Sequence, residues 1–149
     1  MPHALPVPAC GWHTAGMSLR TFLVAGCALG LTACGSSSTH STLAGVYSTA
    51  QASHGKDVYA GMCISCHAGM GNHTGPVFRT RWAGHDLQEM YRFISENMPK
   101  NDPGSLPPED YAAVIAYLLQ MNGMPAGNAA LPTDTVALKA ITLDTVATH

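Results

Sequence analysis

Two cysteines and a histidine in one short segment constrain this chain more than any other feature. The segment reads CISCH, with Cys63 and Cys66 three positions apart and His67 directly after the second cysteine. Cysteines at positions i and i+3 lie on the same face of a helical turn, so both sulfur atoms can reach the edge of one flat ligand. Three kinds of site use this spacing: a redox disulfide, half of a zinc site, and the covalent attachment of a haem.

The rest of the sequence favours haem. A redox Cys-x-x-Cys usually lies where a strand enters a helix, and no alternating strand pattern of useful length is present. A zinc site needs four ligands, and His67, His73 and His85 supply neither a histidine pair nor a second Cys-x-x-Cys at the usual spacing. We therefore interpret Cys63 and Cys66 as the thioether anchors of one covalent haem c, with His67 as the proximal iron ligand.

A haem iron has a sixth position, and Met98 is the best candidate for it. Met98 stands in a Met-Pro pair just past an amphipathic helical pattern, where the chain can cross the second face of a haem. A Met/His ligand pair raises the reduction potential, which suits an electron carrier. The alternative is that Met98 only fills a gap in the core. Met90 lies on the apolar stripe of this helix and is predicted to be a core residue. Met121 and Met124 are less favoured candidates for the sixth iron ligand.

The pattern of apolar residues predicts an all-α fold. A short helix is expected from Ser53 to Cys63. A second helix begins at Asp86, with Glu89 completing a capping box, and it ends at Pro99. A third helix follows two prolines and ends at Asn122-Gly123.

The beginning of the chain has the form of a bacterial export signal. Met17 looks like the true start, because Arg20 precedes an uncharged run from Thr21 to Ala33 that is too short to span a bilayer. The residues up to Cys34 resemble a lipoprotein processing box, which implies cleavage before Cys34 and its lipidation. A weaker box at Cys27, a plain signal peptide and a buried helix are the alternatives.

These observations divide the chain into four parts. Residues 1–33 are the signal segment, and residues 34–52, rich in Ser, Thr, Ala and Gly, are expected to be a flexible tether. Residues 53–124 form the haem-binding domain. Residues 125–149 are expected to be a loosely attached extension with one short helix near Val136 to Ile141.

The charge balance excludes one class of partner. The chain has 7 Lys and Arg against 9 Asp and Glu, a formal net charge of -2, so it lacks the basic surface that nucleic-acid binding requires.

Taken together, CISCH, Gly75-Pro76, Met98-Pro99 and the closing helix LPPEDYAAVIAYLL resemble a bacterial class I cytochrome c over roughly Ser53 to Gly123. The resemblance implies a small helical bundle around one covalently bound haem, with its first and last helices crossing near the haem edge. It also implies that the Pro76 carbonyl accepts a hydrogen bond from the ring of His67.

The same resemblance bears on further residues and on function. Cytochromes of this kind often place cationic or indole side chains near the haem propionates, which makes Arg79, Arg81 and Trp82 candidates, although Arg79 and Arg81 could be solvated and Trp82 could be plain core. The function expected is electron transfer rather than catalysis: a lipid-anchored monohaem cytochrome on the periplasmic side of a bacterial membrane. A dehydrogenase would be its donor, and an oxidase or another cytochrome its acceptor.

Two alternative functions remain at this point. The stretch from Met98 to Gly127 is similar to cytochromes found with quinoprotein alcohol and sugar dehydrogenases, so the protein could be the electron-accepting subunit of such a complex. A haem enzyme or gas sensor is the second alternative, and it would require Met98 to be absent from the iron or readily displaced.

Overall fold

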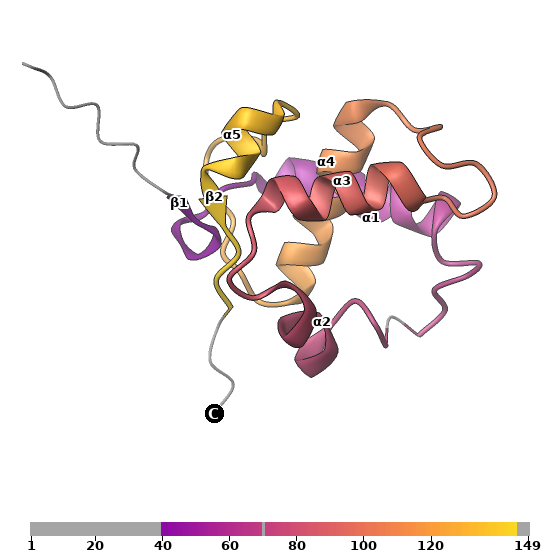
Figure 1. Cartoon of the computed structure of the whole chain (residues 1–149), viewed down its shortest axis with the longest axis horizontal. Helices are drawn as coiled ribbons and strands as arrows, with labels where there is room; N and C mark the ends of the chain where they lie inside the picture. The colour runs from indigo at the N-terminus through magenta and orange to yellow at the C-terminus, as the bar shows by residue number, and fades with distance from the viewer. Residues whose placement is uncertain (1–39, 70, 146–149) are drawn as a thin grey trace, which may run out of the picture. The chain divides into compact units, whose positions relative to one another are not determined.

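The computed structural model describes residues 40–69 and 71–145, and this part of the chain is mostly helical. Its helices are α1 (Thr49–Met62), α2 (Gly75–Trp82), α3 (Leu87–Asn97), α4 (Pro108–Met121) and α5 (Thr135–Lys139) (Figure 1). A 3-10 turn, η1 (Thr42–Ala44), and the two-residue strands β1 (His40–Ser41) and β2 (Ile141–Thr142) complete the described elements. The predicted all-α fold class is confirmed.

Helices α1 and α4 form the centre of the fold. They pack against each other more extensively than any other pair of described elements. Small residues make this close approach possible: Gly55 is buried, and a Cβ atom at that position would lie 1.8 Å from the carbonyl oxygen of Ala113. Because only a hydrogen atom fits there, Gly55 sets the separation of the two helices.

The predicted ends of α3 and α4 agree with the structure. Asp86 caps α3, since its Oδ1 atom accepts a hydrogen bond from the Glu89 N–H at 2.9 Å. The Glu89 carboxylate does not complete the capping box but contacts His85 Nδ1 at 2.6 Å. Helix α3 ends at Asn97, directly before the Met98-Pro99 pair. Helix α4 ends at Met121, directly before Asn122.

Two helices differ from the sequence-based expectation. Helix α1 begins at Thr49 rather than Ser53, because Ser48 Oγ accepts a hydrogen bond from the Gln51 N–H at 3.2 Å and so caps the helix earlier. Helix α2 was not expected from its sequence GPVFRTRW, which is short and has no clear period. It buries only Phe78 and Trp82.

The expectation of a flexible tether over 34–52 is wrong for residues 40–52. Tyr47 is buried and donates a hydrogen bond through its hydroxyl to the carbonyl of Met124 at 2.6 Å. Thr42 is also buried, and its Oγ1 donates to the carbonyl of Asp144 and accepts from the Asp144 N–H. The small polar composition resembles a linker, but these side chains pair with backbone groups about 80 to 100 positions away in the sequence.

The expected loose attachment of residues 125–149 is wrong for residues 125–145. Leu131, Leu138, Ile141 and Leu143 belong to the core, and β2 pairs in parallel with β1. The backbone of Leu143 exchanges hydrogen bonds with Gly84 and His85 in the loop between α2 and α3. These apolar residues are spread over a loop, a short helix and a strand, which explains why no single period was visible. The predicted short helix exists as α5.

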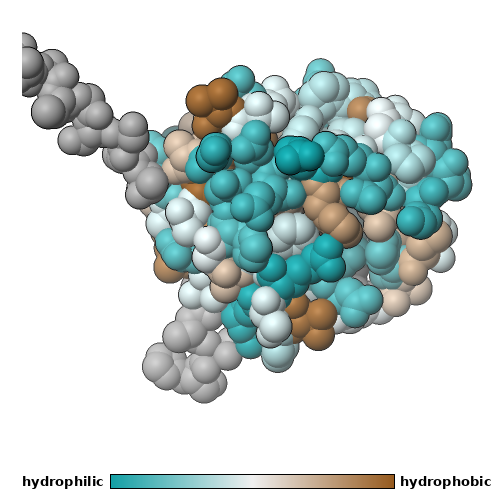
Figure 2. Space-filling model, viewed as in Figure 1, coloured by the Kyte–Doolittle hydropathy of each residue, from teal (hydrophilic) through white to brown (hydrophobic). Residues whose placement is uncertain are grey.

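Some features concern the surface and the chain ends. No helix within the described residues is both long and apolar enough to cross a membrane. The face seen in Figure 2 is largely hydrophilic, with hydrophobic residues in separate patches. The predicted signal segment 1–33 and the predicted lipidation site Cys34 lie outside the described residues.

Candidate haem site

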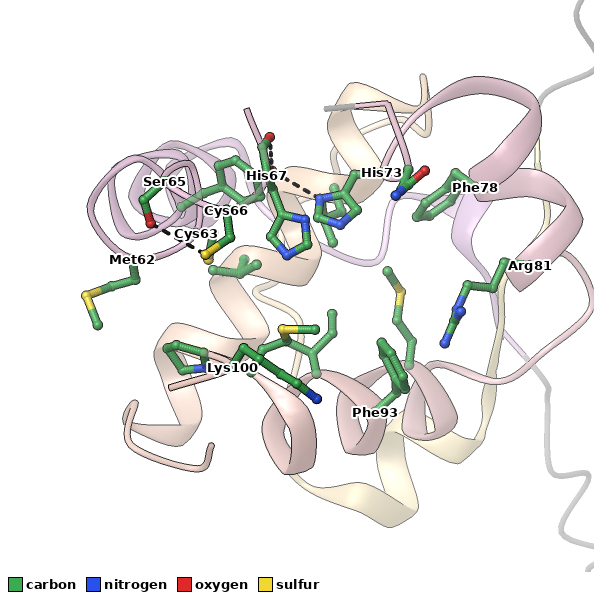
Figure 3. A pocket seen from close by; sticks show the side chains of 18 of the residues that line it. Met62, Cys63, Ser65, Cys66, His67, His73, Phe78, Arg81, Phe93 and Lys100 are labelled. Atoms are coloured by element: carbon green, nitrogen blue, oxygen red, sulfur yellow. Dashed lines mark hydrogen bonds between the residues drawn. The ribbon is translucent and has the colours of Figure 1, made fainter. Parts of the chain in front are cut away.

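The four residues predicted to anchor and ligate a haem line one cavity. Cys63, Cys66, His67 and Met98 border a space of about 630 Å³, although Met98 is more than thirty positions from the cysteines in the sequence. Figure 3 shows the Cys63–His67 segment on one side of this cavity and Phe93 of α3 on another. The size is within the range of cofactor pockets, which is roughly 300–1,000 Å³.

The walls of the cavity are mainly apolar and come from α2, α3 and α4. Helix α3 contributes residues from its predicted apolar stripe, and α4 contributes two residues of its buried face. These wall residues are Val77, Phe78, Trp82, Met90, Phe93, Ile94, Val114 and Leu118. A large flat apolar ligand with a few polar groups suits such a lining.

The CISCH segment forms the turn that its spacing predicted. The N–H groups of Cys63 and Ile64 donate to the Tyr59 carbonyl at the end of α1, and the N–H groups of Cys66 and His67 donate to the Cys63 carbonyl. This turn brings both cysteines to the same cavity, with Cys66 exposed and Cys63 half-buried. Burial, with a smaller contribution from Cys66, raises the pKa of the Cys63 thiol.

His73 is a site residue that the sequence analysis missed, because it was considered there only as a possible zinc ligand. Its ring lies against the ring of His67, with 4.2 Å between the centroids, and it lines the cavity. The Tyr59 hydroxyl lies 3.1 Å from His73 Nδ1 and also donates to the His67 carbonyl at 3.4 Å. Burial, followed by the neighbouring His67, lowers the pKa of His73.

Met98 is placed at the cavity by the end of α3. Its N–H donates to the Ile94 carbonyl at 2.8 Å, and its carbonyl accepts a hydrogen bond from the Tyr111 hydroxyl at 2.9 Å. Met90 also lines the cavity and is buried on α3, as expected for a stripe residue.

Pro76 does not occupy the position that the resemblance implied. It lies in the first turn of α2 and does not line the cavity, and between these two described residues there is no hydrogen bond from the His67 ring to the Pro76 carbonyl. The His67 ring faces His73 instead. The loop before α2 is held by Asn122, whose Oδ1 accepts from the Gly75 N–H at 3.0 Å and whose Nδ2 donates to the His73 carbonyl at 2.8 Å.

Two cationic side chains border the cavity. The Arg81 guanidinium lies 4.2 Å from the ring centroid of Phe93 and 4.9 Å from that of Trp82. Lys100 also lines the cavity, and Figure 3 shows it on a different side from Arg81. Within the described residues neither cation forms an ion pair. Arg79, which the sequence also suggested, is not among the lining residues.

A comparison with known families adds to this geometry. Residues 50–118 match the family model described as "Cytochrome C oxidase, cbb3-type, subunit III". The match supports a c-type cytochrome. A cytochrome c domain implies binding of haem c and electron transfer with protein redox partners. No match was found among curated proteins or among solved structures.

The residues that line this cavity fit a haem c by their chemistry. One cavity brings together the thiols of Cys63 and Cys66, the imidazole of His67 and the thioether of Met98, and its walls are largely apolar. The two cations at its border, Arg81 and Lys100, match the two carboxylates of a haem in number and charge. The matched segment contains every one of these groups and leaves out residues 40–49 and 119–145.

Proposed function

We propose that this protein is a lipid-anchored monohaem cytochrome that carries single electrons between a periplasmic donor and a respiratory acceptor. The observation that carries the proposal is the convergence of Cys63, Cys66, His67 and Met98 on one apolar cavity within a segment that matches a cytochrome family. A dehydrogenase is the expected kind of donor. An oxidase or another cytochrome is the expected acceptor, and the description of the matched family names an oxidase subunit.

Each residue of the site has a distinct role in this proposal. Cys63 and Cys66 would hold the haem through thioether bonds, and His67 and Met98 would ligate its iron. When bound, the haem would supply a one-electron couple. Because both of these iron ligands would be protein side chains, no position would be left open for oxygen or a substrate, which favours a carrier over an enzyme.

The border of the cavity supports an assignment for the haem carboxylates. Arg81 and Lys100 are the cations available to them, and the stacking of Arg81 on Phe93 and Trp82 limits the positions that its guanidinium adopts. Opposite charges at short range hold a carboxylate in its ionised form. These residues therefore favour one orientation of the haem in the cavity.

The anchor places the domain close to a membrane surface. If Cys34 is lipidated, the chain reaches the packed domain at His40, where the His40 N–H donates to the Ala140 carbonyl. Six residues of extended chain span at most about 20 Å. Because residues 40–52 are packed, the domain would stay much closer to its lipid anchor than a flexible tether over 34–52 would allow. A fully modified lipoprotein carries more than one acyl chain, as stable anchoring requires.

The haem assignment is tested on the full chain made in a host that matures c-type cytochromes. We expect intact-mass spectrometry to show one covalently added haem and the pyridine haemochrome spectrum to show a c-type haem. The Cys63→Ala/Cys66→Ala variant is the control and should carry no covalent haem. A purified wild-type chain without added mass would overturn the proposal.

The anchor is tested separately by membrane fractionation. Cys34→Ala should release the haem protein from the membrane fraction, whereas Cys27→Ala, at the weaker processing box, should leave it there. Release by Cys27→Ala alone would assign the processing site to Cys27 and contradict the proposal for Cys34.

A further inference from the structure

Helix α4 carries a polar side chain at each end that contacts one of the two loops bordering the cavity. Tyr111, near its beginning, is buried, and its hydroxyl donates to the Met98 carbonyl at 2.9 Å while accepting from the Leu106 N–H at 3.3 Å. One hydroxyl group thus connects the two ends of the segment 98–106. Asn122, just after the helix, makes the corresponding contacts with His73 and Gly75 on the other side.

The two loops differ in what else holds them. On the His67 side, covalent attachment through the adjacent Cys66 would keep the ligand near the iron even if the loop loosened. Met98 has no such covalent support. Its backbone is held by its own N–H donating to Ile94 and by Tyr111 donating to its carbonyl. Loss of one of these two hydrogen bonds should therefore affect the Met98 side most.

We propose that Tyr111 is a positioning residue that keeps Met98 at the iron through the Met98 carbonyl. This inference rests on the proposed role of Met98 as an axial ligand. The Tyr111 hydroxyl acts on the backbone carbonyl of Met98 and not on its sulfur atom. It fixes the backbone from which the methionine side chain extends. It does so from α4, the helix that also contributes Val114 and Leu118 to the lining of the cavity.

The size of the effect follows from the strength of one hydrogen bond. The net contribution of an ordinary hydrogen bond corresponds to about a fivefold change in an equilibrium constant. Tyr111→Phe keeps the ring and removes the hydroxyl, so it should favour displacement of Met98 by an added ligand by about fivefold.

Tyr91 provides a matched control. It is also buried, its ring lies at 6.2 Å from the ring of Tyr111, and its hydroxyl donates to the Pro108 carbonyl at 3.4 Å. Tyr91→Phe makes the same chemical change next to Tyr111 without removing a hydrogen bond to Met98. A general loosening of the core would affect both variants alike.

The experiment uses the full-length holoprotein in the ferric state and measures two quantities: the methionine–iron charge-transfer band and the equilibrium binding of imidazole to the haem iron. For Tyr111→Phe we expect about fivefold tighter imidazole binding than for wild type. Tyr91→Phe should bind imidazole as wild type does. Unchanged binding in Tyr111→Phe, or equal changes in the two variants, would overturn the inference.

Met98→Ala separates this inference from the proposed function. It should remove the charge-transfer band and bind imidazole most tightly. If the band is unchanged in Met98→Ala, the assignment of Met98 as ligand fails, and the role of Tyr111 fails with it. If Met98→Ala loses the band but Tyr111→Phe matches wild type, the ligand assignment stands and only the positioning role is lost.

Discussion

The packed side of the domain and its cavity side are built in different ways. On the packed side, where α1 meets α4 and residues 40–48 and 125–145 join the core, backbones approach until only glycine fits. On the cavity side, Cys63, His67 and Met98 border a space of about 630 Å³. The contrast shows which part of the fold the chain completes alone and which part is shaped for a cofactor.

The terminal segments extend the packed side beyond the matched family segment. Gln51 makes two side-chain hydrogen bonds with the backbone of Leu131, and Gly127 donates to the Tyr47 carbonyl at 2.7 Å. Small domains bury too little apolar surface to be very stable, so added core residues matter. The described extension supplies such residues without contributing to the lining of the cavity.

The largest expected effect comes from the closest contact on the packed side. In Gly55→Ala the new Cβ would meet the Ala113 carbonyl oxygen at 1.8 Å, so α1 and α4 must separate. We expect the free energy of unfolding to fall by more than about 3 kcal/mol, which is above the usual cost of overpacking. Chemical denaturation of the holoprotein measures it.

Gly61→Ala is the control for this substitution. Gly61 lies in the last turn of the same helix, and a Cβ there has no neighbour within 4 Å. Alanine in a helix is favoured over glycine by about 0.5–1 kcal/mol, so this variant should be as stable as wild type or slightly more so. Equal losses in both variants would show that the α1–α4 separation is not set by Gly55.

The next effect tests whether the C-terminal extension belongs to the packed side. Leu138 is fully buried in α5, so Leu138→Ala should lower the free energy of unfolding by about 3 kcal/mol through lost burial and a cavity. Val136 in the same helix is 77% exposed, and Val136→Ala should change it by less than about 0.5 kcal/mol. If Leu138→Ala costs no more than Val136→Ala, the extension does not contribute to the core in solution.

The prediction with the smallest effect near neutral pH concerns the free energy of unfolding and Tyr59. This residue belongs to α1 and also lines the cavity, so it lies where the packed side and the cavity side meet. Burial, with smaller contributions from Cys63 and Tyr117, raises the pKa of Tyr59 from 10.0 to about 12. The folded state therefore holds the neutral phenol more strongly than the unfolded chain does. The resulting stabilisation is complete below pH 10.0 and is lost as the pH rises through about 12.

Tyr59→Phe removes this ionisable group. We expect the free energy of unfolding of this variant to decrease less steeply with pH between 10.0 and 12 than that of wild type. Denaturation curves across this range provide the measurement. Parallel pH dependences in the two proteins would show that Tyr59 titrates in the folded state as it does in the unfolded chain.

Much of the site could be predicted because its signals are local. The spacing in CISCH predicted the turn that brings Cys63 and Cys66 together, and the helix-stopping Met98-Pro99 pair predicted where α3 ends. Helix α2 left a weaker signal, a proline in its first turn, which is a favourable position for proline. His73, Lys100, Tyr111 and Asn122 could not be assigned, because their roles depend on partners far away in the sequence.

The sequence alone determined the helical class and the choice of candidate haem-binding residues, because each depends on residues within a few turns of one another. The candidates are Cys63 and Cys66 as anchors and His67 and Met98 as ligands. Only the tertiary structure decided that residues 40–52 and 125–145 are packed and that His73 lies against His67. It also decided that Tyr111 holds the backbone of Met98. These features arise from contacts between segments that are far apart in the sequence. A single hydrogen bond or buried ring produces no periodic pattern of residues from which it could be predicted.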